Sequence, residues 1–162
     1  MKVIHPINPI IAPNSKILIL GSMPSPESRK VGFYYGHPRN RFWSVMSTIL
    51  AEPLPKTNEE KSDMLLRNKI ALWDVLAVCE IEGAADSSIK NAVPNDIEAL
   101  ILNTDIKAVF MTGSTAYRLY EKHFAKKIPL PYHCLPSTSP ANAKMTAEAL
   151  AEKYLVILEY FK

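Results

Sequence analysis

Short apolar runs alternate along the chain with stretches in which apolar residues recur every three or four positions. The runs consist mainly of Ile, Val, Leu and aromatic residues and end at Gly, Pro or polar residues, as buried parallel strands do. They cover residues 16–20, 69–73, 107–112 and 132–135. This alternation predicts an α/β fold, a three-layer α/β/α sandwich whose central four-stranded sheet is mostly parallel.

Helical patterns fill the intervals between these runs and follow the last one. Asn95, which comes directly after Pro94, is a candidate N-cap for one of the helices. No repeat, low-complexity tract or linker interrupts the pattern, so residues 1–162 are expected to form a single domain. The expected helices cover residues 40–50, 56–68, 95–102, 114–124 and 143–161.

Composition narrows the class of protein without deciding the function. Apolar residues make up 48% and charged residues 22% of the chain, which is ordinary for a globular protein. No apolar run is long enough to span a membrane, and the N-terminal residues lack a signal-peptide core, so we expect a cytoplasmic protein. The two cysteines, Cys79 and Cys134, lie in apolar stretches and are interpreted as reduced core thiols.

The loop that follows the first apolar run combines positive charge with aromatic rings. Four cations and three consecutive aromatic residues stand between Ser22 and Trp43, where Glu27 is the only acid. Because cations bind phosphates and rings stack on bases, this composition is typical of single-strand or flipped-base recognition. The loop leaves the carboxyl end of a predicted strand, where open α/β sheets hold their sites. We therefore expect Arg39 and Arg41 to contact DNA, although both are also compatible with solvated loop charges.

A second loop, after the last predicted strand, is rich in hydroxyl groups. Hydroxyls and free backbone N–H groups that lead into a helix favour phosphate binding, which makes this loop a second DNA contact. The alternative is a loop that only caps the final helix. The expected DNA-binding residues here are Ser137, Thr138, Ser139 and Asn142.

Three segments resemble motifs of the uracil-DNA glycosylase superfamily. Residues 21–24, Gly-Ser-Met-Pro, resemble its first motif, and residues 136–140, Pro-Ser-Thr-Ser-Pro, resemble its second. Residues 32–43 are similar to the Gly-Phe-x-x-x-His-Pro-x-Asn-Arg-Phe-Trp run of the mismatch-specific uracil/thymine branch. By motif the chain is most similar to the hypoxanthine-DNA glycosylase family. The resemblance implies an α/β/α fold, a DNA substrate and base-contacting residues at Gly21, Ser22, Met23, Pro24 and Thr112.

The chain departs from the superfamily at the usual catalytic position. Met23 stands where most members carry Asp or Asn, and a thioether can neither orient nor deprotonate water. The resemblance to the hypoxanthine family instead implies that Asn40 is the catalytic residue, with its carbonyl holding water against C1′. Asn40 is also a candidate N-cap of the following helix. Tyr35 is expected to stack on the extruded base.

These features predict a monofunctional DNA glycosylase that hydrolyses the N-glycosidic bond of deaminated bases, hypoxanthine first and uracil second, in base excision repair. No metal or cofactor is expected, and the protein is expected to act as a monomer. Because of Met23, the alternative is a non-catalytic binder of mismatched or damaged DNA on the same fold. A serine hydrolase that uses Ser22 or Ser25 with His37 is a second alternative, but it lacks a nucleophile-elbow motif.

Overall fold

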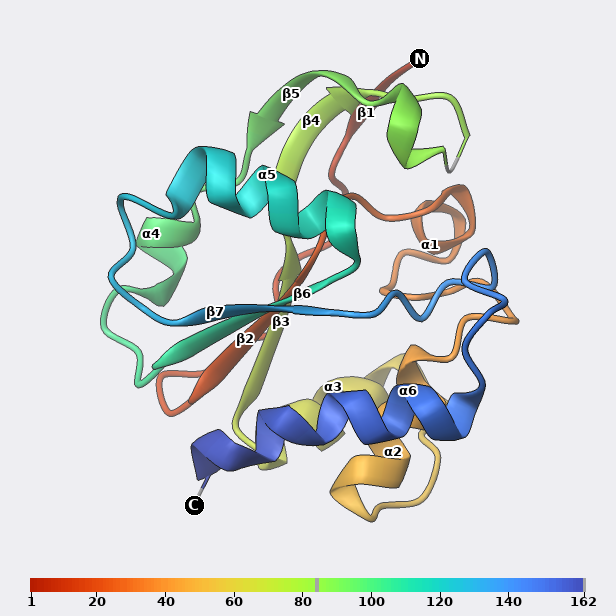
Figure 1. Ribbon diagram of the computed structural model, residues 1–162, viewed down its shortest axis with the longest axis vertical. Coiled ribbons are helices and arrows are strands. Elements are labelled where there is room, and N and C mark those ends of the chain that lie inside the picture. The colour runs from red at the N-terminus through yellow and green to blue at the C-terminus, as the bar shows by residue number, and fades with distance from the viewer. Residues whose placement is uncertain (84, 162) are drawn as a thin grey trace.

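The four predicted apolar runs form one parallel sheet. The computed structural model describes residues 1–83 and 85–161, and its central sheet crosses the middle of the molecule (Figure 1). The strands are β2 (Ile17–Gly21), β3 (Ile70–Asp74), β6 (Ala108–Thr112) and β7 (Tyr132–Leu135), in the order β3-β2-β6-β7. Since all neighbours in this sheet are parallel, their carboxyl ends lie at the same edge.

Side chains of each central strand alternate between two hydrophobic cores. In β2, Ile17 and Ile19 belong to one core while Leu18 and Leu20 belong to the other, as the two-residue period of a strand requires. Helices α2 (Phe42–Leu50), α3 (Asn58–Arg67) and α6 (Ala147–Tyr154) cover the first face. Helices α4 (Ile97–Ile101) and α5 (Ser114–Phe124) cover the second (Figure 1). The predicted three-layer α/β/α fold is confirmed.

Several helix boundaries differ from those expected. The final helix α6 ends at Tyr154 and continues as a 3-10 helix, η2 (Leu155–Phe161), so the single helix expected over residues 143–161 is wrong in its second half. A short helix, α1 (Pro26–Val31), was not predicted. The N-cap of α4 is Asp96, whose carboxylate accepts from the Ala99 backbone N–H, and not Asn95.

A second, antiparallel sheet was also not predicted. It consists of β1 (Lys2–Ile4), β4 (Leu76–Glu80) and β5 (Lys90–Pro94), with a 3-10 turn, η1 (Asp86–Ser88), between β4 and β5. Strand β3 passes into β4 through Val75, so one continuous stretch of chain joins the two sheets (Figure 1). The buried amide of Asn95 donates to the carbonyls of Asp74 and Leu76 and fixes this crossing. Asn95 is therefore a bridge between the sheets.

The N-terminal segment lies against the open edge of β3. The backbones of Ile10 and Leu72 exchange two hydrogen bonds of 2.9 and 2.8 Å, and the backbone N–H of His5 donates to the carbonyl of Ala77. These contacts place His5 beside the carboxyl end of β3, although it is 69 residues from Asp74 in the chain.

The two cysteines differ in environment. Cys79 is buried as expected, whereas Cys134 is exposed, so the interpretation of Cys134 as a core thiol is wrong. Cys134 lies on β7, an edge strand of the parallel sheet, whose residues are less covered than those of the central strand β2. Within the described ranges, no helix has the length and apolar character needed to cross a bilayer.

Candidate functional site

A cavity of about 360 Å³ opens at the carboxyl edge of the parallel sheet. Its volume is in the range of ordinary small-ligand sites. Strands β2, β3 and β6 each contribute their last residue, Gly21, Asp74 and Thr112, and both predicted loops complete the walls. The structure thus brings together, around one hollow, segments that are more than a hundred residues apart in the sequence.

Most of the expected site residues line this cavity. They are Gly21, Ser22, Met23, Pro24, Tyr35, Asn40, Thr112, Ser137, Thr138 and Ser139. Arg39, Arg41 and Asn142 are not among the lining residues. The sequence interpretation missed Asp74 and Asp86, which also line the cavity.

The amide of Asn40 is fixed by two hydrogen bonds to its oxygen. Oδ1 accepts from the backbone N–H of Phe42 at 2.9 Å and from the hydroxyl of Thr138 at 2.8 Å. The N-cap residue of α2 is Arg41, which makes no side-chain capping bond, so the N-cap expected at Asn40 is wrong by one position. Asn40 still supplies a capping bond from the preceding position, because it satisfies the Phe42 N–H at the start of α2. The contact with a backbone N–H also identifies the oxygen, because a flipped amide would set two donors against each other.

This arrangement changes the chemistry available to Asn40. Because both lone pairs of Oδ1 are occupied, the expected water-holding carbonyl is not free to accept from water. The amide nitrogen, Nδ2, is left without a hydrogen bond among the described residues. Asn40 therefore presents a donor to the cavity.

Arg41, which is half-buried, connects the two loops through hydrogen bonds. Its guanidinium donates to the backbone carbonyls of Ser139 and Asn142, at 3.0 and 2.9 Å, and to that of Met145. Its backbone N–H donates to the carbonyl of Thr138 at 3.1 Å. Arg41 thus holds the second loop in place, a role that differs from the phosphate contact expected from the sequence.

Thr138 also has a structural role that the sequence did not reveal. It is only 1% exposed, and its hydroxyl donates to Asn40. The hydroxyl proton is therefore not available for the phosphate contact that the sequence predicts. Asn142 donates through its amide to the Ser137 carbonyl. Ser137 and Ser139 accept from backbone N–H groups of the loop, which leaves their own hydroxyl protons free for a ligand.

Tyr35 stands between the core and the cavity. One face of its ring stacks on Phe42, with centroids 4.0 Å apart and planes inclined by 13°. Its hydroxyl lies 3.0 Å from that of Thr112. Burial, and secondarily the nearby Asp74 carboxylate, raise the pKa of Tyr35, so the phenol stays protonated at neutral pH. The neighbouring Tyr34 is a core residue, whose hydroxyl donates to the Asn8 carbonyl.

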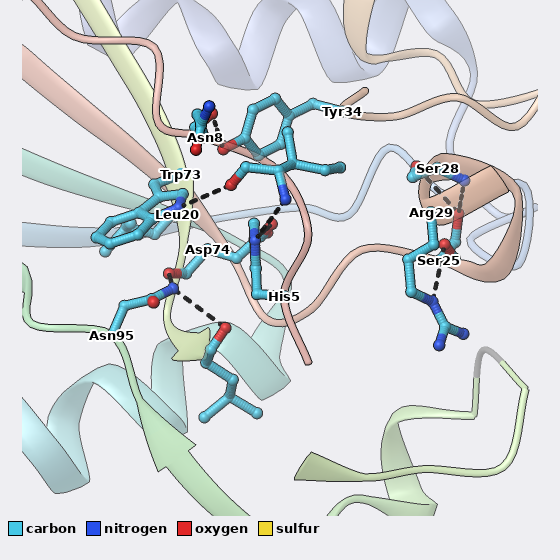
Figure 2. A network of polar contacts seen from close by, with 12 residues as sticks. His5, Asn8, Leu20, Ser25, Ser28, Arg29, Tyr34, Trp73, Asp74 and Asn95 are labelled. Carbon is cyan, nitrogen blue, oxygen red and sulfur yellow. Dashed lines mark hydrogen bonds and ion pairs between the residues drawn. The ribbon is translucent and has the colours of Figure 1, made fainter. Parts of the chain in front are cut away.

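A buried carboxylate and an imidazole meet at the end of β3. Asp74 Oδ2 lies 2.7 Å from His5 Nε2, and the two side chains are 6% and 3% exposed (Figure 2). His5 Nδ1 accepts from the Ile7 backbone N–H, which places the donated proton on Nε2. The other oxygen, Asp74 Oδ1, has no hydrogen bond among the described residues and belongs to the cavity lining.

The charged side chains that line the cavity are acidic. Glu27, Asp74 and Asp86 are among its residues, whereas no Lys or Arg of the described chain is. Asp86 accepts from the Ser22 hydroxyl at 3.3 Å. His37 forms a turn contact, since its Nδ1 accepts from the Arg39 N–H. Over residues 1–83 and 85–161, no three His, Cys, Asp or Glu side chains converge in the manner of a metal site.

Sequence and structure comparisons agree with this architecture. Residues 9–161 match the family model described as the uracil DNA glycosylase superfamily. The solution NMR structure of a Methanosarcina acetivorans protein, described as a candidate uracil DNA glycosylase, superposes with a TM-score of 0.85 at 30% identity and covers 100% of both chains. The chain therefore belongs to the uracil DNA glycosylase superfamily, whose members are DNA glycosylases.

Two curated relatives are both named hypoxanthine DNA glycosylase. The one from Methanosarcina acetivorans is 33% identical over 145 residues, which cover 88% of this chain and 90% of the relative. The one from Methanosarcina barkeri is 39% identical over 107 residues, 65% of this chain and 68% of the relative. These matches confirm the resemblance inferred from the motifs.

Proposed function

We propose that this protein is a monofunctional DNA glycosylase that hydrolyses the N-glycosidic bond of deaminated bases, with hypoxanthine preferred over uracil. The observation that carries the proposal is the cavity at the carboxyl edge of the sheet, into which both family motifs and Tyr35 project. Two relatives named hypoxanthine DNA glycosylase support the order of the substrates. The product, an abasic site, would then enter base excision repair.

Tyr35 is suited to receive an extruded base. Phe42 supports one face of its ring from the core, and Tyr35 itself lines the cavity. A rigid, supported ring loses little freedom when a base stacks on it, and such stacking contributes about 1–3 kcal/mol. Extrusion itself costs a few kcal/mol and is least costly for mismatched bases, which is the condition of most deaminated ones.

Asn40 is proposed as the catalytic residue, through its amide nitrogen. Bond breaking between a base and deoxyribose passes through an oxocarbenium-like sugar, which a weak nucleophile can capture. A water molecule that accepts a hydrogen bond from Nδ2 keeps a second lone pair for C1′. Because Oδ1 is anchored on Phe42 and Thr138, the water would be positioned without any movement of the side chain.

The departing base needs donors rather than acceptors. Leu135 provides no side-chain donor, so the backbone N–H groups of residues 21–25 are proposed to stabilise the negative charge that develops on the base. The first loop reaches the cavity through Ser22, Met23 and Pro24. No lysine is among the described lining residues, which favours simple hydrolysis over a Schiff-base step.

A panel of otherwise identical duplexes carrying inosine, uracil, xanthosine or adenine tests the proposal. Each duplex is incubated with excess protein and then treated with alkali, which breaks the strand only where a base has been released. We expect rapid release of hypoxanthine, slower release of uracil and no strand breaks without alkali. Tight binding of inosine-containing DNA without any alkali-sensitive site would instead identify a non-catalytic binder. Trapping of a protein–DNA adduct by borohydride would overturn the monofunctional assignment.

A further inference from the structure

A second hollow, of about 300 Å³, lies at the amino edge of the parallel sheet, opposite the edge that holds the first cavity. This amino-edge pocket is formed by residues 16, 50 and 67–69 together with residues 158 and 161 of η2. Lys16 directly precedes β2 and Gly21 ends it, so about 16 Å of strand separate the two hollows. In Figure 1 the C-terminal segment runs beside the amino edge, away from α1 and the motif loops.

The charged residues that line the amino-edge pocket are all basic. They are Lys16, Arg67 and Lys69, and no Asp or Glu of the described chain is among the lining residues. Arg67 is paired with Glu52, whereas the ammonium groups of Lys16 and Lys69 have no ion pair or hydrogen bond within residues 1–83 and 85–161. Two positive charges therefore remain uncompensated in this hollow, which is the reverse of the first cavity.

The backbone holds these two lysines side by side. The Lys16 N–H donates to the Lys69 carbonyl at 2.7 Å, where β2 and β3 begin to pair. Lys69 has a φ of 60°, in the left-handed region that Gly and Asn adopt most readily. Strained backbone of this kind clusters at functional sites. The chain thus carries a lysine where a glycine would be unstrained, and its charge faces a hollow that the proposed reaction does not use.

The rest of the lining suits a flat, weakly polar body. Leu50, Leu158 and the ring of Phe161 supply partly exposed apolar surface. The Asn68 amide donates both N–H groups to neighbouring acceptors, which leaves Oδ1 as an acceptor without a partner among the described residues. A nucleobase can stack on an aromatic ring, and an exocyclic amino group can donate to such an oxygen. The volume is at the lower end for small-ligand sites and exceeds what a phosphate ion alone would fill.

We propose that the amino-edge pocket is a second binding site, which takes a nucleotide with an amino-bearing base such as adenine. Lys16 and Lys69 bind the phosphate, and the ring of Phe161 stacks on the base. Charge complementarity selects the phosphate, because each lysine acts as a point charge that no protein group neutralises. This site lies at the opposite edge from the proposed chemistry, so the inference goes beyond the glycosylase function and does not depend on it.

Titrations of isotope-labelled protein, followed through backbone amide NMR signals, test the proposal. The ligands are AMP, adenosine, inorganic phosphate and a trinucleotide of adenine with a phosphate at its 5′ end. We expect AMP to shift the amide signals of residues 16, 69 and 161. Adenosine and phosphate each lack half of the contacts and should bind at least about tenfold more weakly than AMP. Tighter binding of the trinucleotide than of AMP would identify a strand end as the ligand, and the reverse a free nucleotide.

Single substitutions connect the affinity to the two lysines. Lys16→Gln and Lys69→Asn each remove one charge, and Asn is tolerated in the left-handed region. Each should weaken AMP binding by about tenfold. Lys122→Gln is the matched control, because it removes an exposed lysine from α5, which covers the other face of the sheet, and should leave AMP binding unchanged. Hypoxanthine release should be the same in all three variants, since none of these lysines lines the first cavity.

Several outcomes would overturn the proposal. Absence of any amide shift at several millimolar AMP would do so, as would shifts confined to residues 21–24 and 35 of the first cavity. If phosphate binds as tightly as AMP, the pocket holds an anion and not a nucleotide. If adenosine does, or if Lys122→Gln weakens binding as much as Lys16→Gln, the two lysines do not bind the phosphate. The comparison of AMP with adenosine uses the wild-type protein, so it decides even where a variant fails to fold.

Discussion

The hydroxyl of Thr138 donates to Asn40 Oδ1 across 2.8 Å, and the two residues are 98 positions apart in the chain. This bond joins the second loop to the proposed catalytic amide of the first loop. It is the second hydrogen bond that Oδ1 accepts, so the orientation of the whole amide is fixed before any substrate enters. The loop that was expected to bind phosphate therefore supports the proposed catalytic residue as well.

Replacing Thr138 with Val should remove this support while keeping the shape of the side chain. We expect a loss of about 1 kcal/mol in the free energy of unfolding, measured with urea, because one buried hydrogen bond is lost. Base release should fall about tenfold, since Asn40 becomes free to rotate, and Thr138→Ser should restore both. Wild-type release in the Val variant would mean that the Phe42 N–H alone holds the amide.

Two variants separate the capping role of Asn40 from its proposed catalytic role. Asn40→Ala should reduce single-turnover base release by at least about 10²-fold and lower the stability by about 1 kcal/mol. Asn40→Asp retains an oxygen for Phe42 and Thr138, so its melting temperature should return close to that of the wild type. Its release rate should lie between those of the wild type and the Ala variant, because its second oxygen orients water as an acceptor and cannot donate. If Asn40→Ala loses only stability, Asn40 is a cap and nothing more.

Two variants of Tyr35 distinguish the ring from the hydroxyl. Tyr35→Phe loses the 3.0 Å contact with Thr112 but keeps the stack on Phe42, so we expect base release within a few-fold of the wild type and a stability loss of about 1 kcal/mol. Tyr35→Ala removes a ring that packs on the core and should cost about 3 kcal/mol or more in addition to lowering release. Equal activity losses in the two variants would contradict the stacking role.

The two loop arginines should respond differently to the same substitution. Arg39 is exposed and its guanidinium has no hydrogen bond or ion pair within the described residues, so Arg39→Gln should leave stability unchanged. In DNA binding, it should flatten the plot of log affinity against log salt by about 0.9 at most. Arg41→Gln should instead lower the melting temperature, because three carbonyls of the second loop lose their donor. A matching salt effect in both variants, with unchanged melting, would restore Arg41 as a phosphate contact.

The parallel sheet was predictable because its strands are buried on both faces and therefore read as uninterrupted apolar runs. The antiparallel sheet has no such signal. Strand β5 carries the polar residues Lys90 and Asn91, and β4 follows β3 through Val75 without an intervening turn. In the sequence, β3 and β4 therefore look like one strand with an irregular end, although they belong to different sheets.

Of the residues that line the cavity, the sequence predicted mainly those that belong to its motifs. Asp74 resembles the polar end of a strand in the sequence, and its partner His5 is brought to it by the N-terminal segment. Arg41 shows a second difficulty, because the sequence does not reveal the three loop carbonyls that its guanidinium binds. Such contacts depend on the tertiary arrangement of distant segments, which local patterns do not record.

The close approach of Gly21 to Asp74 constrains how this protein can evolve. Any side chain at position 21 would place its Cβ 2.4 Å from Asp74 Oδ1, which is much closer than van der Waals contact. Alanine at position 21 therefore requires the Asp74 carboxylate to move away from its bond with His5, or to be replaced, and either change alters an acceptor in the cavity. Gly21 and Asp74 are 53 positions apart in the chain but are partners at the ends of adjacent parallel strands, so a change at either position acts on the other.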